Sequence, residues 1–109
     1  MPRAADPPVT AKDDTVILSR RFEELIPGFI ENRRKELEEL RGALEAGRYE
    51  QLGLLGHRMR GIGSTYGFDR VSDFGGHIEQ RAAASDREGL AACLAEYEDY
   101  LARVKVVYE

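Results

Sequence analysis

The sequence predicts an all-α fold, an antiparallel up-down-up-down four-helix bundle with a short extra helix at its N-terminus. Four stretches repeat apolar residues at steps of three and four, which places these side chains on one face of a helix. Only a few residues separate successive stretches, so neighbouring helices should run antiparallel. Beyond residues 15–18, no stretch has the alternation typical of a strand.

The N-terminal residues differ in composition from the rest of the chain. Residues 1–14 hold three of the four prolines and almost no large hydrophobic residue, so we expect a disordered tail there and one bundle domain over 15–109. The sequence TVIL at 15–18 is apolar and β-branched. It either packs as an extended lead-in or joins the short extra helix expected over SRRFEELI.

The long helices begin and end at residues typical of helix termini. Pro27 suits the first turn of the first helix, whereas Gly47 and Gly67 are natural stops for the first and second. The expected helices cover about 27–46, 49–66, 69–84 and, after an N-cap at Ser85 or Asp86, the stretch through Val104.

Each of these helices has a predicted buried face. Arg33 occupies an inward position in the first helix, and Cys93 is expected to be a small core residue in the fourth. The apolar residues expected inside are Ile30, Leu37, Leu40, Leu44, Leu52, Leu55, Met59, Ile62, Tyr66, Val71, Phe74, Ile78, Ala82, Leu90, Leu94, Tyr97, Leu101 and Val104.

Composition excludes several classes of function. The formal net charge of −4 gives no support to a nucleic-acid partner, and no apolar run approaches the roughly 20 residues that span a bilayer. The start of the chain lacks the apolar region of a secretory signal. A single cysteine rules out an internal disulfide, and two histidines without matching carboxylates make a poor metal site. We therefore expect a cytoplasmic protein without a metal or membrane partner.

His57 is the candidate reactive residue. At about 100° of rotation per residue, it lies about 180° from the centre of the apolar face of its helix, with Arg60 and Ser64 on its own face. Gly53 and Gly61 flank it at i−4 and i+4 and clear bulk from both sides. An exposed neutral imidazole is a nucleophile, and a cation one turn away would offset an anionic group placed on it. This arrangement favours reversible phosphorylation of His57.

Gly56 and Gly63 belong to a second set of glycines in the same helix. They lie near the flanks of the apolar face, where they would let a neighbouring helix approach closely. His77, on the next helix, is expected to be a solvated or edge residue.

At these residues the sequence resembles the histidine phosphotransfer (HPt) domain family of two-component phosphorelays. The motif reads His57-Arg58-Met59-Arg60-Gly61-Ile62-Gly63-Ser64, followed by Gly67. The resemblance extends forward through residues 68–86 and back to 25–52. Nearly the whole chain after the N-terminal tail is therefore covered.

The resemblance implies a role for each matching residue. His57 would accept a phosphoryl group at Nε2, and Arg60 stands where the family usually has a lysine. Gly61 matches the glycine that leaves room for the partner. Glu79 occupies a place where related domains often carry a polar residue near the histidine, and an acid pointing inward there would disfavour phosphate.

The implied activity is that of a phosphoryl carrier rather than an enzyme. The sequence has no glycine-rich phosphate loop, no nucleotide-binding signature and no acidic Mg²⁺ cluster. The chain would take a phosphoryl group from an aspartyl-phosphate on a response-regulator receiver domain and pass it to another receiver. The receiver would supply Mg²⁺. A hybrid histidine kinase is a further expected partner, and a monomer is expected because the chain supplies all four helices itself.

A docking surface is expected around His57. Apolar Leu54 projects toward the exposed side, and Arg48, Arg58 and Arg60 would form a basic patch that suits an acidic receiver site. The expected docking residues are Gly53, Leu54, Arg58, Gly61 and Ser64.

Three other functions compete with this interpretation. A helical adaptor could bind receivers without accepting phosphate, although it would need neither His57 nor Arg60. The phosphoacceptor hairpin of a histidine kinase has an acid directly after the histidine and then a proline, whereas Arg58 follows here and residues 28–109 contain no proline. A kinase-attached phosphoacceptor domain remains open if the chain is a fragment, but Met1 and a nearly complete domain favour a separate protein.

Overall fold

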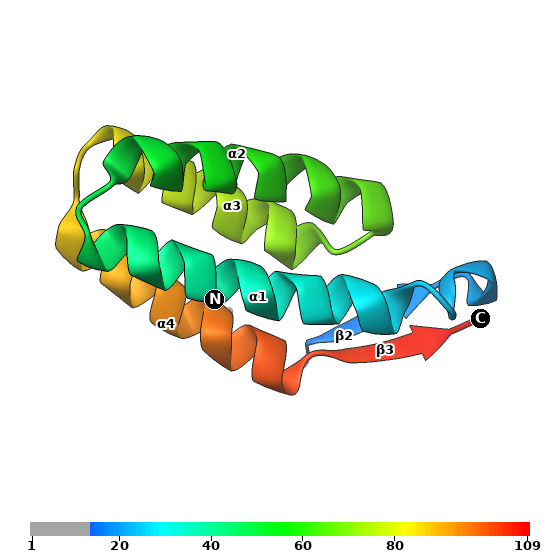
Figure 1. The fold of residues 1–109 in the computed structure, drawn as a ribbon. Coiled ribbons are helices and arrows are strands. Elements are labelled where there is room, and N and C mark those ends of the chain that lie inside the picture. The colour runs from blue at the N-terminus through cyan, green and yellow to red at the C-terminus, as the bar shows by residue number, and fades with distance from the viewer. Residues whose placement is uncertain (1–13) are drawn as a thin grey trace, which may run out of the picture.

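The computed structural model describes residues 14–109 and confirms the four-helix bundle. In Figure 1, α2 and α3 lie together on one side of the bundle, and α1 and α4 lie together on the other. Successive helices run antiparallel, as the short connections predict. The helices are α1 (Ile26–Glu45), α2 (Tyr49–Tyr66), α3 (Asp69–Ala83) and α4 (Arg87–Arg103).

The helix ends follow from the residues that occupy them. Gly47 and Gly67 adopt the left-handed backbone expected of helix stops, with φ of 71° and 82°. Of the two expected caps of α4, Asp86 takes the role, because its carboxylate accepts a hydrogen bond from the backbone N–H of Gly89 at 2.9 Å. Ser85 instead has a left-handed backbone in the turn after α3.

The predicted core is largely confirmed. The inward residues expected on α2, α3 and α4 are buried or packed against the buried cluster, and so is Cys93. Arg33 is only 7% exposed, with its guanidinium over the Phe29 ring. The sequence pattern missed Phe68, which precedes α3 and is fully buried, its ring stacked on that of Phe29 at 4.7 Å.

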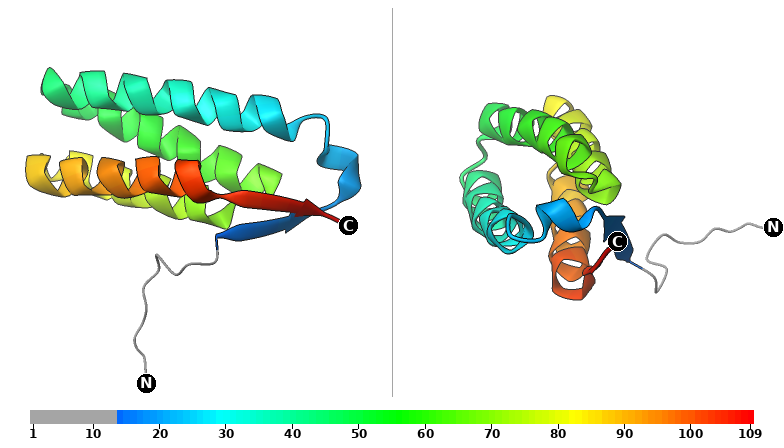
Figure 2. Two further views of the ribbon diagram at one scale, coloured as in Figure 1. Left: turned by 90° about the horizontal axis from the view of Figure 1, so that it is seen from below. Right: turned by 90° about the vertical axis from the view of Figure 1, so that its right-hand side faces the viewer.

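The ends of the domain contain two short strands, and here the sequence prediction needs correction. The lead-in is extended: β2 (Thr15–Leu18) pairs in parallel with β3 (Lys105–Tyr108), as Figure 2 shows. No second strand was expected, and the placement of Val104 in the fourth helix is wrong. Helix α4 ends at Arg103, and Val104 has an extended backbone that leads into β3. The short extra helix is a single 3-10 turn, η1 (Arg20–Phe22).

The expected tail lies outside the described residues except for its last residue. Asp14 is buried, and its carboxylate accepts hydrogen bonds from Arg70 of α3 at 3.0 Å and from Arg103 of α4. Asp14 is therefore part of the folded domain, which begins at least one residue earlier than the sequence predicts. Within residues 14–109, no helix is long and apolar enough to cross a membrane.

Candidate functional site

Two glycines set the distance between α2 and α3 where the site is built. A Cβ atom added at Gly56 would lie 2.7 Å from the carbonyl oxygen of Gly75, and one added at Gly75 would lie 2.6 Å from the carbonyl oxygen of Gly56. The two helix backbones are thus in direct contact, which any larger residue at either position would prevent. The predicted role of Gly56 in close helix packing is confirmed.

A second close approach lies one to two turns further along α2. A Cβ atom added at Gly63 would lie 2.5 Å from the backbone nitrogen of Ser72, as expected for the other packing glycine. The Ser72 hydroxyl donates a hydrogen bond to the carbonyl oxygen of Arg60 at 2.8 Å. These contacts fix α3 against the part of α2 that carries His57 and Arg60.

His57 projects from α2 into solvent, as its position opposite the apolar face predicts. Its side chain is 69% exposed, and its Nδ1 atom lies 3.2 Å from Oε2 of Glu79 on α3. The other carboxylate oxygen of Glu79 accepts a hydrogen bond from Arg60 at 2.7 Å. One carboxylate therefore joins the predicted nucleophile and the predicted cation.

This contact determines which nitrogen of His57 is nucleophilic. The hydrogen bond from Arg60 holds the pKa of the Glu79 carboxyl below its usual range, so the group is a carboxylate at neutral pH and can only accept hydrogen bonds. The proton of the neutral imidazole is then held at Nδ1 by Glu79, and the lone pair is on Nε2. Within residues 14–109, no hydrogen bond engages Nε2.

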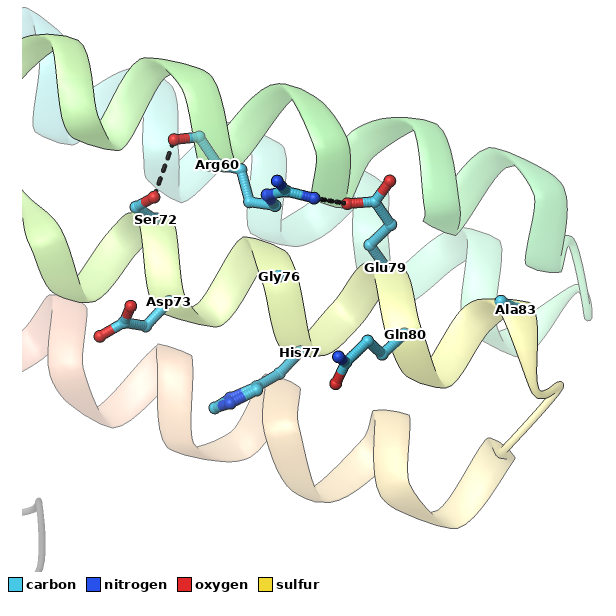
Figure 3. A pocket seen from close by; sticks show the side chains of 8 residues that line it. All are labelled: Arg60, Ser72, Asp73, Gly76, His77, Glu79, Gln80 and Ala83. Carbon is cyan, nitrogen blue, oxygen red and sulfur yellow. Dashed lines mark hydrogen bonds and ion pairs between the residues drawn. The ribbon is translucent and has the colours of Figure 1, made fainter.

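Two hollows flank the Glu79 carboxylate. One, of about 290 Å³, is mostly apolar and contains the exposed Leu54 beside His57. The other, of about 630 Å³, is lined by Arg60 and by residues along α3, which Figure 3 labels. In that view the His77 side chain points away from the Arg60–Glu79 pair, in agreement with its prediction as an exposed residue.

The remaining predicted docking residues lie on or beside this face. Ser64 and Gly61 are exposed, and a Cβ atom added at Gly61 would meet nothing within 4 Å. Gly53 is half-buried, and a Cβ there would make an ordinary contact with Ala82 at 3.8 Å. Both glycines therefore leave the flanks of His57 clear.

The predicted basic patch is divided between the two sides of α2. Burial raises the pKa of the Glu36 carboxyl on α1, with Arg33 and then Arg58 opposing the rise, so Arg58 lies on the side of α2 that faces α1. Arg60 lies on the opposite side, paired with Glu79 of α3. At about 100° of rotation per residue, positions 58 and 60 lie about 200° apart, so the helical periodicity already separates these two arginines.

Two glycines of α3 that the sequence pattern did not single out also lie against α2 at this site. Gly75 of α3 allows the close approach of α2, whereas a Cβ added at the adjacent Gly76 would make only an ordinary contact with Cδ of Arg60 at 3.6 Å. Two consecutive glycines inside a strongly periodic helix were the available signal. In the part of the chain that the structure describes, no group of three or more His, Cys, Asp or Glu residues could hold a metal ion.

Comparison with protein families finds a match along most of the chain. The family model for the Hpt domain matches residues 24–106, a range that contains all four helices together with His57, Arg60 and Glu79. Comparisons with curated proteins and with solved structures gave no match.

Proposed function

Because this chain belongs to the Hpt domain family, whose members carry phosphoryl groups in two-component relays, we propose that His57 is its phosphoacceptor. The observation that carries the proposal is the state of the His57 ring. Glu79 holds Nδ1, Nε2 of the exposed side chain has no hydrogen-bond partner within residues 14–109, and Arg60 lies one turn away. A carrier needs this combination of an accessible nucleophile and a nearby positive charge.

The transfer reaction balances without moving a proton. The Nε2 lone pair attacks the phosphorus of an aspartyl-phosphate on a receiver domain, the P–O bond breaks, and the aspartate carboxylate leaves. The proton on Nδ1 stays in place, and the Glu79 carboxylate beside it stabilises the positive charge that develops on the ring. In the reverse direction, a receiver carboxylate attacks the phosphorus and the electrons of the P–N bond return to Nε2. Mg²⁺ bound by the receiver would offset phosphoryl charge during both steps.

The apolar hollow beside His57 supports docking of a receiver at this face. Leu54 is 62% exposed and stands at the edge of the hollow, so burying it against an apolar partner surface would stabilise a complex. Gly53, Gly61 and Ser64 present little bulk around His57, which allows the receiver aspartate to reach Nε2. We expect Arg58 to contribute charge attraction at the edge of the same surface.

Members of this family usually work in the cytoplasm together with receiver domains, and we propose the same location and partners for this chain. The residues described supply one complete four-helix bundle, which supports a monomeric carrier.

The test is transfer of labelled phosphate from a panel of receiver aspartyl-phosphates. We expect acid-labile, base-stable label on the wild-type protein and none on His57→Gln. The matched control is His77→Gln, which removes the other histidine of the chain and should keep the label. Label that survives His57→Gln would place the acceptor elsewhere. Receiver binding without any label would support the adaptor function instead.

A further inference from the structure

Arg60 is already bound to an anion before any phosphate arrives. Its guanidinium donates to Glu79 at 2.7 Å, and the same carboxylate also holds Nδ1 of His57. We propose that Arg60 exchanges partners during the relay, leaving Glu79 for the phosphoryl group on His57, and that Glu79 thereby reduces what Arg60 contributes to holding the phosphate. The inference rests on the proposed function, because it requires His57 to carry the phosphoryl group.

The surroundings of Arg60 allow this movement. Its side chain is 53% exposed, and the hollow of about 630 Å³ beside it is open to the guanidinium. Its aliphatic part passes over Gly76, where an added Cβ would lie 3.6 Å from Cδ of Arg60. Arg60 follows His57 by one helical turn on the same face, so a change of rotamer would bring its donors to a group on Nε2.

The charges of the two anions favour the exchange of Arg60 from Glu79 to the phosphoryl group, but only by a modest amount. A phosphoryl group carries about −1.5 to −2 charges and three acceptor oxygens, whereas Glu79 offers one charge. Arg60 must give up its bond to Glu79 to gain the new one, and solvent screens both interactions because the site is exposed. Glu79 therefore reduces the net benefit that Arg60 brings to phosphorylated His57. This competition for Arg60 favours release of the phosphoryl group to the next receiver.

The first test follows Arg60 directly and uses no receiver. His57 is phosphorylated with phosphoramidate, a small-molecule phosphoryl donor, and the Nε–H signal of Arg60 is followed by NMR, assigned by its loss in Arg60→Lys. In unphosphorylated protein, the signal should differ between wild type and Glu79→Gln. After phosphorylation the two signals should converge, because Arg60 then binds phosphate in both. A signal that stays in place on phosphorylation of the wild type would overturn the exchange.

The second test measures the cost of the competition by a double-mutant cycle. The fraction of label on His57 at equilibrium with a receiver is compared for Arg60→Gln in the wild-type and Glu79→Gln backgrounds. We expect a loss of about threefold in wild type and about tenfold without Glu79, since only in wild type must Arg60 first leave a partner. Arg58→Gln is the matched control, and its effect should be the same in both backgrounds. Equal losses for Arg60→Gln would refute the competition.

The two tests separate this inference from the proposed function. If phosphorylation by phosphoramidate shifts the Arg60 signal but no receiver transfers label, the exchange of partners by Arg60 is supported. A receiver domain as the phosphoryl donor is then not supported. If receivers label His57 while the Arg60 signal stays fixed, the proposed function stands and the exchange does not. A His57 that phosphoramidate cannot modify would count against both.

Discussion

Gly56 offers the sharpest test of how the site is held together. In Gly56→Ala, the new Cβ would lie 2.7 Å from the carbonyl oxygen of Gly75 and 2.9 Å from the backbone nitrogen of Glu79, against 3.4–4 Å for an ordinary contact. Both neighbours are backbone atoms and cannot rotate away, so α2 and α3 must separate. Overpacking of this kind costs about 3 kcal/mol at the upper end of its range. The better helix propensity of alanine contributes about 1 kcal/mol in the opposite direction, so the free energy of unfolding should fall by about 2 kcal/mol.

Gly61→Ala is the matched control, because it makes the same substitution five residues later in the same helix. No atom lies within 4 Å of a Cβ added there, so this variant should gain about 1 kcal/mol. Urea unfolding followed by circular dichroism should therefore separate the two variants by about 3 kcal/mol. A Gly56→Ala variant as stable as wild type would refute the argument that backbone contact sets the distance between α2 and α3.

Three further predictions concern other parts of the molecule. Leu54→Glu should slow receiver transfer about tenfold with little change in stability, whereas Leu25→Glu, at an exposed residue just before α1, should leave transfer unaltered in the same kinetic assay. Tyr97→Phe should raise the free energy of unfolding by about 1 kcal/mol, because the Tyr97 hydroxyl is buried without a hydrogen-bond partner in the described part of the chain. A lower stability of this variant in urea unfolding would show that the hydroxyl has a hydrogen-bond partner. Burial raises the pKa of the Cys93 thiol from 9.0 to about 11, which lowers the fraction of reactive thiolate at pH 8. The native protein should therefore react with iodoacetamide about 100-fold more slowly than the urea-unfolded chain. Equal rates would contradict the burial of Cys93.

The helices could be predicted because their signals are local. The stretch 49–66 contains its own apolar spacing and is followed directly by its stop, Gly67, and α2 has these bounds in the structure. The outward direction of His57 follows from the same periodicity. Gly56 and Gly63 could be assigned to helix packing because their place on the helix surface depends only on the rotation per residue.

The strands could not be predicted in the same way. The sequence KVVY at 105–108 continues the spacing of α4 as well as it suits a strand, and its pairing partner is at 15–18, some 90 residues earlier. A parallel pairing over that distance depends on where the bundle places the two ends of the chain. The burial of Asp14 between Arg70 and Arg103 has the same origin.

The sequence by itself determined the four amphipathic helices, the exposed imidazole of His57 and the cation one turn from it, since all of these depend on residues within a few turns of one helix. Only the tertiary structure decided what Glu79 does. Its carboxylate reaches both His57 and Arg60 because Gly56 and Gly75 let two helix backbones touch. The distance between two helices is set by the packing of both surfaces together, and no pattern within either helix contains it.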